Sequence, residues 1–130
     1  MHADRYLTDL LTRDPLTGLA NRRGLEQRLD ACFAARGASV TLLHLEIDAL
    51  ECIAQAHGHG EADALQRAVA AALQRRVRGN DCVARVADGA FVVACVGADP
   101  AVTELLVQRL EAAVVGARCL AADRRSLLGC

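Results

Sequence analysis

The sequence predicts one mixed α/β domain, of the α+β kind, built on a small antiparallel sheet. The chain has 130 residues, the length of one ordinary domain, and 53% of them are apolar, which is enough to build a core. The stretch VARVADGAFVVACVG, from Val83 to Gly97, predicts two strands rich in β-branched residues and joined by a tight turn. Elsewhere the apolar residues recur mostly at helical spacing, which predicts helices packed on this hairpin.

The N-terminal part of the chain predicts two helices. Residues 1–13 are expected to form a connector helix that ends before Asp14-Pro15. Its apolar face would carry Tyr6, Leu7, Leu10 and Leu11. After the turn PLTG, Asn21 is a candidate N-cap for a second helix, which Gly37 would end. The apolar residues of this second helix are Leu25, Leu29, Cys32 and Phe33.

The rest of the chain completes a βαββαβ order. The run from Val40 to Ile47 is typical of a buried strand; an irregular segment follows, and then a helix from about Gly60 to Val77. After the hairpin, Asp99-Pro100 predicts the start of another helix, and residues 125–130 predict a last strand. This order indicates a ferredoxin-like core with the hairpin at the centre of the sheet and helices on one face.

Composition excludes several classes of partner. Fifteen Arg, no Lys and sixteen acids give a net charge of −1, and aromatic residues make up only 2%, so neither bulk charge nor base stacking favours nucleic acid. The six cysteines lack C-x-x-C spacing and are interpreted as reduced core residues of a cytoplasmic chain. No signal peptide or bilayer-spanning run is recognisable, so no membrane partner is expected within this chain.

Three segments resemble one known family. DPLTGLANRRGL, from Asp14 to Leu25, is similar to the opening motif of GGDEF domains, the diguanylate cyclases that condense two GTP into cyclic di-GMP. LEIDALECIAQAHGHGEAD resembles the strand, short helix and loop that hold metal and guanine in that family. RVADGAF falls on the segment that names the family, with Phe91 matching its phenylalanine. The resemblance implies a GGDEF-like domain over residues 14–130, with the last part of the family's fold missing.

The resemblance also implies that the metal site is degenerate. The family holds two divalent ions with a first-strand carboxylate and two adjacent acids in the hairpin turn, as hard cations require. Here the first position is Glu46, and the two turn acids are replaced by Gly89 and Ala90. The two preceding glycines are replaced by Ala87 and Asp88. Asp88 is an alternative ligand, but a shift of one residue along a strand turns its side chain to the other face.

Only some of the nucleotide-binding residues implied by the resemblance are present in this sequence. Ala54 replaces an amide that pairs with guanine, and Glu51 replaces a lysine, while Asp63 keeps the carboxylate of the guanine site. We therefore expect no cyclase activity and no required cofactor; Mg²⁺ would enter only if GTP binding persists through Glu46 and Asp63.

A separate ligand site is implied by the segment Arg78-Gly79-Asn80-Asp81. It matches the family's Arg-x-x-Asp sequence, which binds cyclic di-GMP as an inhibitory signal, and Arg109 matches a third partner on the following helix. A guanidinium and a carboxylate suit guanine and phosphate. The alternative is a solvated ion pair between Arg78 and Asp81. The pair His57 and His59 is interpreted as structural rather than as a metal site.

The resulting hypothesis is a degenerate, non-catalytic GGDEF domain that acts in bacterial signalling as a regulatory cyclic di-GMP-binding module. One alternative is a pure interaction module, which forms a homodimer or docks on a partner sensor or effector domain. Another is residual GTP binding or cyclase activity. Because a sheet that stops early exposes an edge, the chain is expected to self-associate or to cover that surface with its N-terminal helix.

Overall fold

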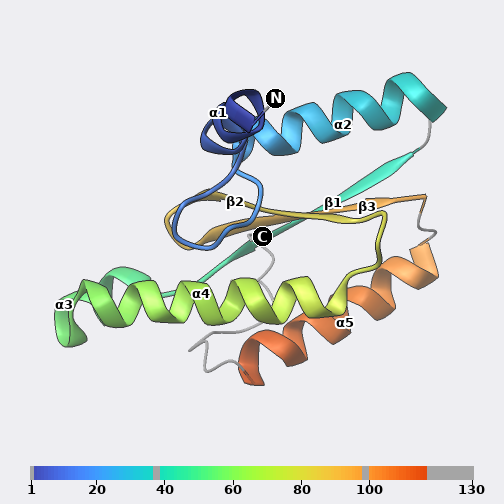
Figure 1. Ribbon diagram of the computed structural model, residues 1–130. Coiled ribbons are helices and arrows are strands. Elements are labelled where there is room, and N and C mark those ends of the chain that lie inside the picture. Colours follow the sequence, from blue (N-terminus) through green and yellow to red (C-terminus); the bar gives the residue numbers. More distant parts are fainter. Residues whose placement is uncertain (1, 37–38, 98–99, 117–130) are drawn as a thin grey trace.

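The computed structural model describes residues 2–36, 39–97 and 100–116, which form helices and strands in mixed order (Figure 1). Along the chain these are α1 (His2–Thr12), α2 (Arg22–Arg36), β1 (Val40–Glu46), α3 (Leu50–His57), α4 (His59–Arg76), β2 (Cys82–Ala87), β3 (Ala90–Val96) and α5 (Pro100–Gly116). The strand expected at 125–130 lies outside the described residues.

The sheet is antiparallel, with strand order β1-β3-β2. β1 pairs with β3 from Val40 opposite Val96 to Glu46 opposite Ala90. The predicted hairpin is confirmed: β2 and β3 are joined at Asp88 and Gly89, and Gly89 has a φ of +70°, a conformation that favours glycine. Among the described strands only β3 is central, whereas β2 lies at an edge.

Helices cover both faces of the sheet rather than one. In Figure 1, α1 and α2 lie on one side, while α4 and α5 lie on the other. The cause is β3, which is buried on both faces: Phe91 and Val93 pack in the cluster under α4 and α5, whereas Val92 and Ala94 pack with Leu25 of α2. A strand that is apolar on both faces requires cover on both, and the continuous run FVVACV was the signal of this arrangement.

Most predicted helices form, and one helix appears where the apolar pattern indicated none. The Asn21 cap is confirmed, since its Oδ1 accepts the Gly24 N–H at 2.9 Å. The segment read as irregular contains α3, which the family resemblance implied. Apolar periodicity missed α3 because none of its residues is buried, and no side chain caps its start at Ala49, where φ is 60°. Among the described helices none is long and apolar enough to cross a membrane.

The described cysteines are free thiols, but they do not all lie in the core. Cys82 and Cys95 are buried, Cys32 is half-buried and Cys52 is exposed, so the core interpretation is wrong for Cys52. Burial, together with the Asp81 carboxylate, raises the pKa of Cys95 to about 11. At neutral pH this thiol is protonated and packs as a small apolar side chain.

Candidate functional site

The positions that the resemblance assigns to metal ligands lie at the end of β1 and in the hairpin turn. Glu46 is exposed at the end of β1, and the residue directly opposite it on β3 is Ala90. Two residues paired across strands place their side chains on the same face of the sheet. The Glu46 carboxylate therefore faces a methyl group where a second carboxylate would be needed for a dinuclear site. Among the described residues, no three His, Cys, Asp or Glu side chains gather to hold a metal ion.

Asp88, the alternative metal ligand, is already engaged by protein groups. Arg85 Nη2 donates to Asp88 Oδ1 at 2.7 Å, and Gln66 Nε2 donates to the same oxygen at 3.2 Å. Although the Asp88 side chain is 80% exposed, these two donors hold it toward Arg85. The structure thus supplies an intramolecular partner for the one acid that remains in the turn.

Arg85 is the centre of this network. Its side chain is 15% exposed, its Nη1 donates to Asp14 Oδ1 at 2.7 Å, and its Nε donates to Gln66 Oε1 at 2.9 Å. The same Gln66 oxygen accepts the Gly89 N–H at 2.8 Å. Burial raises the pKa of Asp14, but hydrogen bonds from Thr17 and Arg85 outweigh it and hold that pKa below its usual range. We name this set, Asp14, Gln66, Arg85 and Asp88, the turn network.

Sequence reasoning missed Gln66 and Arg85. A signal for Gln66 existed, because it is a polar residue on the face of α4 that also carries Ala62, Val69 and Leu73, all buried. Gln66 itself is 1% exposed, and a polar side chain at such a position needs hydrogen-bond partners. The partners are 19, 22 and 23 residues away in the sequence, so no local pattern identifies them.

Arg78 and Asp81 are brought together at the turn between α4 and β2. Arg78 Nε lies 3.6 Å from Asp81 Oδ2, and the two side chains are 58% and 0% exposed. Both carboxylate oxygens also accept backbone N–H groups, Oδ2 from Arg78 at 3.1 Å and Oδ1 from Val96 at 3.3 Å. Asp81 therefore ties the start of β2 to the end of β3. The guanidinium of Arg78 is presented to solvent, but the carboxylate is turned inward.

The remaining residues singled out from the sequence are not joined to this pair. Arg109 is exposed on α5, and none of the contacts found among the described residues links it to Arg78 or Asp81. Asp63 is half-buried on α4. His57 is the last residue of α3 and His59 the first of α4, and both are exposed.

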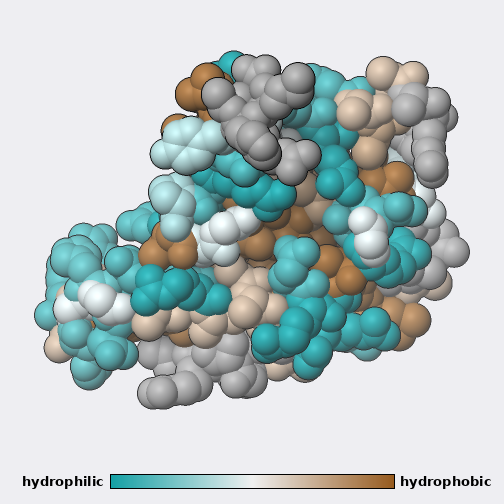
Figure 2. Space-filling model, in the orientation of Figure 1, coloured by the Kyte–Doolittle hydropathy of each residue, from teal (hydrophilic) through white to brown (hydrophobic). Residues whose placement is uncertain are grey.

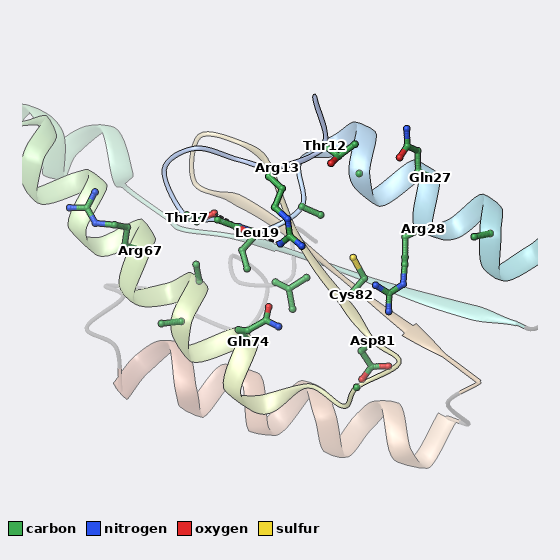
Figure 3. A pocket seen from close by; sticks show the side chains of 18 residues that line it. Thr12, Arg13, Thr17, Leu19, Gln27, Arg28, Arg67, Gln74, Asp81 and Cys82 are labelled. Atoms are coloured by element: carbon green, nitrogen blue, oxygen red, sulfur yellow. Dashed lines mark hydrogen bonds between the residues drawn. The ribbon is translucent and has the colours of Figure 1, made fainter. Parts of the chain in front are cut away.

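A groove of about 730 Å³ follows the open edge of β2, between α2 and α4. Figure 2 shows this region as a hollow with apolar surface at its floor and hydrophilic side chains along its sides. Figure 3 shows Arg13 and Arg28 directed from the α2 side toward Cys82, while Arg67 on α4 points away from them. Asp81 lies at one end of the groove. Nothing in the sequence pattern indicated this groove.

Comparison with known proteins agrees with this architecture. The family described as diguanylate cyclase, GGDEF domain, matches residues 11–119. Diguanylate cyclase DgcP of Pseudomonas aeruginosa is 36% identical over 104 residues, which are 78% of this chain and 16% of DgcP. The chain therefore spans a small part of the length of that relative.

Two solved structures from Caulobacter crescentus are similar in both sequence and fold. A sensory box/GGDEF family protein is 34% identical with a TM-score of 0.71, over 78% of this chain and 69% of the other. The coiled coil and GGDEF domain of DgcB, in complex with c-di-GMP, is 25% identical with a TM-score of 0.77, over 84% and 59% of the two chains. Because the family match spans most of the chain and the fold agrees, this chain belongs to the GGDEF domain family of diguanylate cyclases.

Proposed function

We propose that this domain is a non-catalytic, regulatory member of its family. The observation that carries the proposal is the pairing of Glu46 with Ala90, which leaves the first-strand acid without a second carboxylate. Asp88 does not substitute for it, because its carboxylate is bound by Arg85 and Gln66. Two-metal phosphoryl transfer requires ligands that bridge both ions, and the turn lacks them.

The ligand proposed for this module is cyclic di-GMP, bound through Arg78, Asp81 and Arg109. Support comes from the exposed guanidinium of Arg78 and from the related GGDEF domain of DgcB, whose structure contains c-di-GMP. Asp81 holds the turn that presents Arg78, and its carboxylate is 0% exposed and accepts two backbone N–H groups. Arg78 and Arg109 are thus the residues expected to contribute most of the affinity.

A second candidate function is a protein-interaction module, and α1 favours it. Tyr6, Leu7, Leu10 and Leu11 lie on α1 with 53–65% of each residue exposed. An apolar helix face of this kind is suited to a second copy of the chain or to a neighbouring domain. In this function α1 acts as the connector of residues 1–13, and the domain of residues 14–130 serves as the platform that positions it.

Titration separates these candidates from residual nucleotide binding. Calorimetry with cyclic di-GMP should show binding that Arg78→Ala weakens roughly 30- to 150-fold, the equivalent of about 2–3 kcal/mol for a charge-assisted contact. Arg109→Ala should weaken it in the same direction. Arg75→Ala is the matched control, because Arg75 is exposed in the last turn of α4 and lines neither site.

Two results of the titration would reject binding of cyclic di-GMP or favour nucleotide binding instead. If the unmodified domain binds no cyclic di-GMP at high micromolar concentration, the receptor proposal is rejected and the interaction module becomes the better account. If it binds GTP with Mg²⁺ and Glu46→Ala abolishes that binding, residual nucleotide binding through Glu46 and Asp63 is the correct alternative.

A further inference from the structure

We propose that the groove between α2 and α4 binds a compact phosphate-bearing ligand, whose dianionic phosphate lies between Arg13 and Arg28 over the open edge of β2. This site adjoins the proposed cyclic di-GMP site at Asp81, which lines the groove, but it uses other cations, because neither Arg78 nor Arg109 lines the groove. The chemical class is a phosphate monoester or diphosphate group, free or carried by a nucleotide.

The two guanidinium groups are held on the same side of the groove. Arg13 follows α1 directly; its backbone pairs with Ala20, and its Nη1 donates to the Gly18 carbonyl at 3.0 Å. Arg28 extends from α2 toward Cys82 (Figure 3), and within the described part of the chain no hydrogen bond or ion pair engages it. Burial raises the pKa of Cys82, while Arg28 and Arg13 both act to lower it. The positive charges of Arg13 and Arg28 therefore both act on Cys82, which lines the groove.

Among the described residues, the groove lining contains both arginines of this pair but one carboxylate. That carboxylate, Asp81, lies at one end of the groove and already has Arg78 as its charged partner, with Nε 3.6 Å from Oδ2. Two guanidinium groups directed at one small space repel each other, and a dianion between them replaces repulsion by two charge-assisted attractions. The planar, multi-donor guanidinium is also the side chain best matched to phosphate oxygens.

The shape of the open edge favours a compact ligand over an added strand. At one end the edge is already occupied, because the Arg85 N–H donates to the Ala20 carbonyl at 2.9 Å. At the other end the Asp81 N–H donates to the Arg78 carbonyl at 3.0 Å. Val83 lies between these two ends. Because amides alternate in direction along a strand, the Val83 N–H points away from β3, to the same side as the N–H of Arg85, two residues later. One open residue is too short for strand addition, but its N–H is a third donor for an anion.

The volume of the groove agrees with a small ligand. About 730 Å³ lies within the range of small-molecule sites, which is roughly 300–1,000 Å³. Much of the lining consists of Gly and Ala, among them Gly18, Ala20, Ala70 and Ala71, so the floor is wide and the polar groups stand at its side. Such a site leaves room for a nucleoside attached to the phosphate.

The test is calorimetry at low ionic strength on the whole chain, with inorganic pyrophosphate and ADP as probes. Both are expected to bind, since they share the diphosphate. Arg28→Gln removes a guanidinium that no hydrogen bond or ion pair engages within the described part of the chain, and it should weaken binding roughly ten- to hundred-fold. Arg13→Gln should weaken binding to a similar extent. Arg75→Gln is the matched control and should have no effect. Amide NMR should show the Val83 N–H shift on addition of pyrophosphate.

Three results would overturn the proposal: no binding of pyrophosphate at millimolar concentration, equal affinities of the Arg28→Gln and Arg75→Gln variants, or an unmoved Val83 amide at saturation. Arg78→Ala distinguishes this site from the cyclic di-GMP site, because it should leave pyrophosphate binding unchanged. Competition by cyclic di-GMP, whose phosphates are diesters with one charge each, would also contradict a site built for a dianion.

Discussion

Replacing Arg85 by Met tests whether the turn network stabilises the fold. The change keeps an unbranched side chain but removes the partner of Asp14 and the donor to Gln66. Asp14 is 7% exposed, and Thr17 alone would remain to bond its carboxylate. Breaking a buried ion pair from one side costs 3–5 kcal/mol, and the partial exposure of Arg85 places the expected loss of unfolding free energy near the lower end, at about 3 kcal/mol.

The acid dependence of stability provides a second, independent readout. The pKa of Asp14 is lowered in the folded protein, so its contribution is present above the unfolded pKa and is lost as pH falls through the folded pKa. Two of the groups that lower this pKa belong to Arg85, namely a hydrogen bond and its charge. In Arg85→Met the pKa of Asp14 should rise, and the loss of stability as pH falls below the ordinary carboxyl pKa of 3.8 should become shallower.

Urea unfolding followed by circular dichroism at several pH values measures both effects. Arg75→Met is the matched control, because it makes the same chemical change at an exposed residue outside the turn network. The reasoning is refuted if Arg85→Met costs less than about 1 kcal/mol, the value of a surface ion pair. It is equally refuted if the acid limb of the variant is as steep as that of the parent.

Three further predictions use other parts of the structure. The domain should form no cyclic di-GMP from GTP with Mg²⁺ or Mn²⁺. The double variant Gly89→Asp, Ala90→Glu should not restore activity, because a Cβ at Gly89 would lie 2.9 Å from Leu50 Cδ2 and the backbone there has a φ of +70°. Product detected by chromatography from either protein would disprove this. Asp81→Asn should lower the unfolding free energy by about 1–3 kcal/mol, because an amide has only one acceptor oxygen and one of the two backbone N–H groups would lose its partner. An unchanged urea midpoint would contradict the structural role assigned to this carboxylate. The double variant Leu7→Glu, Leu10→Glu should abolish self-association through α1, whereas Thr8→Glu on the same helix should not. Light scattering measures the masses. If the parent self-associates and the double variant has the same mass, this face of α1 is not the interface.

The parts of the fold that the sequence predicted are those with a local cause. The Asn21 cap, the hairpin and α5 each depend on residues within one or two turns of each other, such as the side chain of Asn21 and the N–H of Gly24. The short helix α3 escaped apolar periodicity because none of its residues is buried. The cover on both faces was readable from β3, whose apolar run does not alternate with polar residues.

The site was less predictable because its contacts join distant segments. Arg85 and Asp14 are 71 residues apart, and only the folded chain shows that they meet. The Arg78 and Asp81 pair was identified from its spacing, but spacing gave no information on exposure, and the carboxylate proved to be buried while the guanidinium is not. The groove depends on four elements, the end of α1, α2, α4 and the edge of β2, so no single stretch of sequence contains it.

Each end of β2 is held by hydrogen bonds from groups of the protein itself. At the hairpin end, the Gly89 N–H and the Asp88 carboxylate are bound by Gln66 and Arg85, so the turn has hydrogen-bond partners without a metal ion or a nucleotide. At the opposite end, Asp81 bonds the start of β2 to Val96. Groups of the protein itself thus satisfy each end of the strand. Two exposed guanidinium groups lie elsewhere, that of Arg28 in the groove and that of Arg78, whose Nε is 3.6 Å from Asp81. Ligand recognition by this domain is therefore expected at the turn that begins β2 and along the edge of that strand, and not at the hairpin turn.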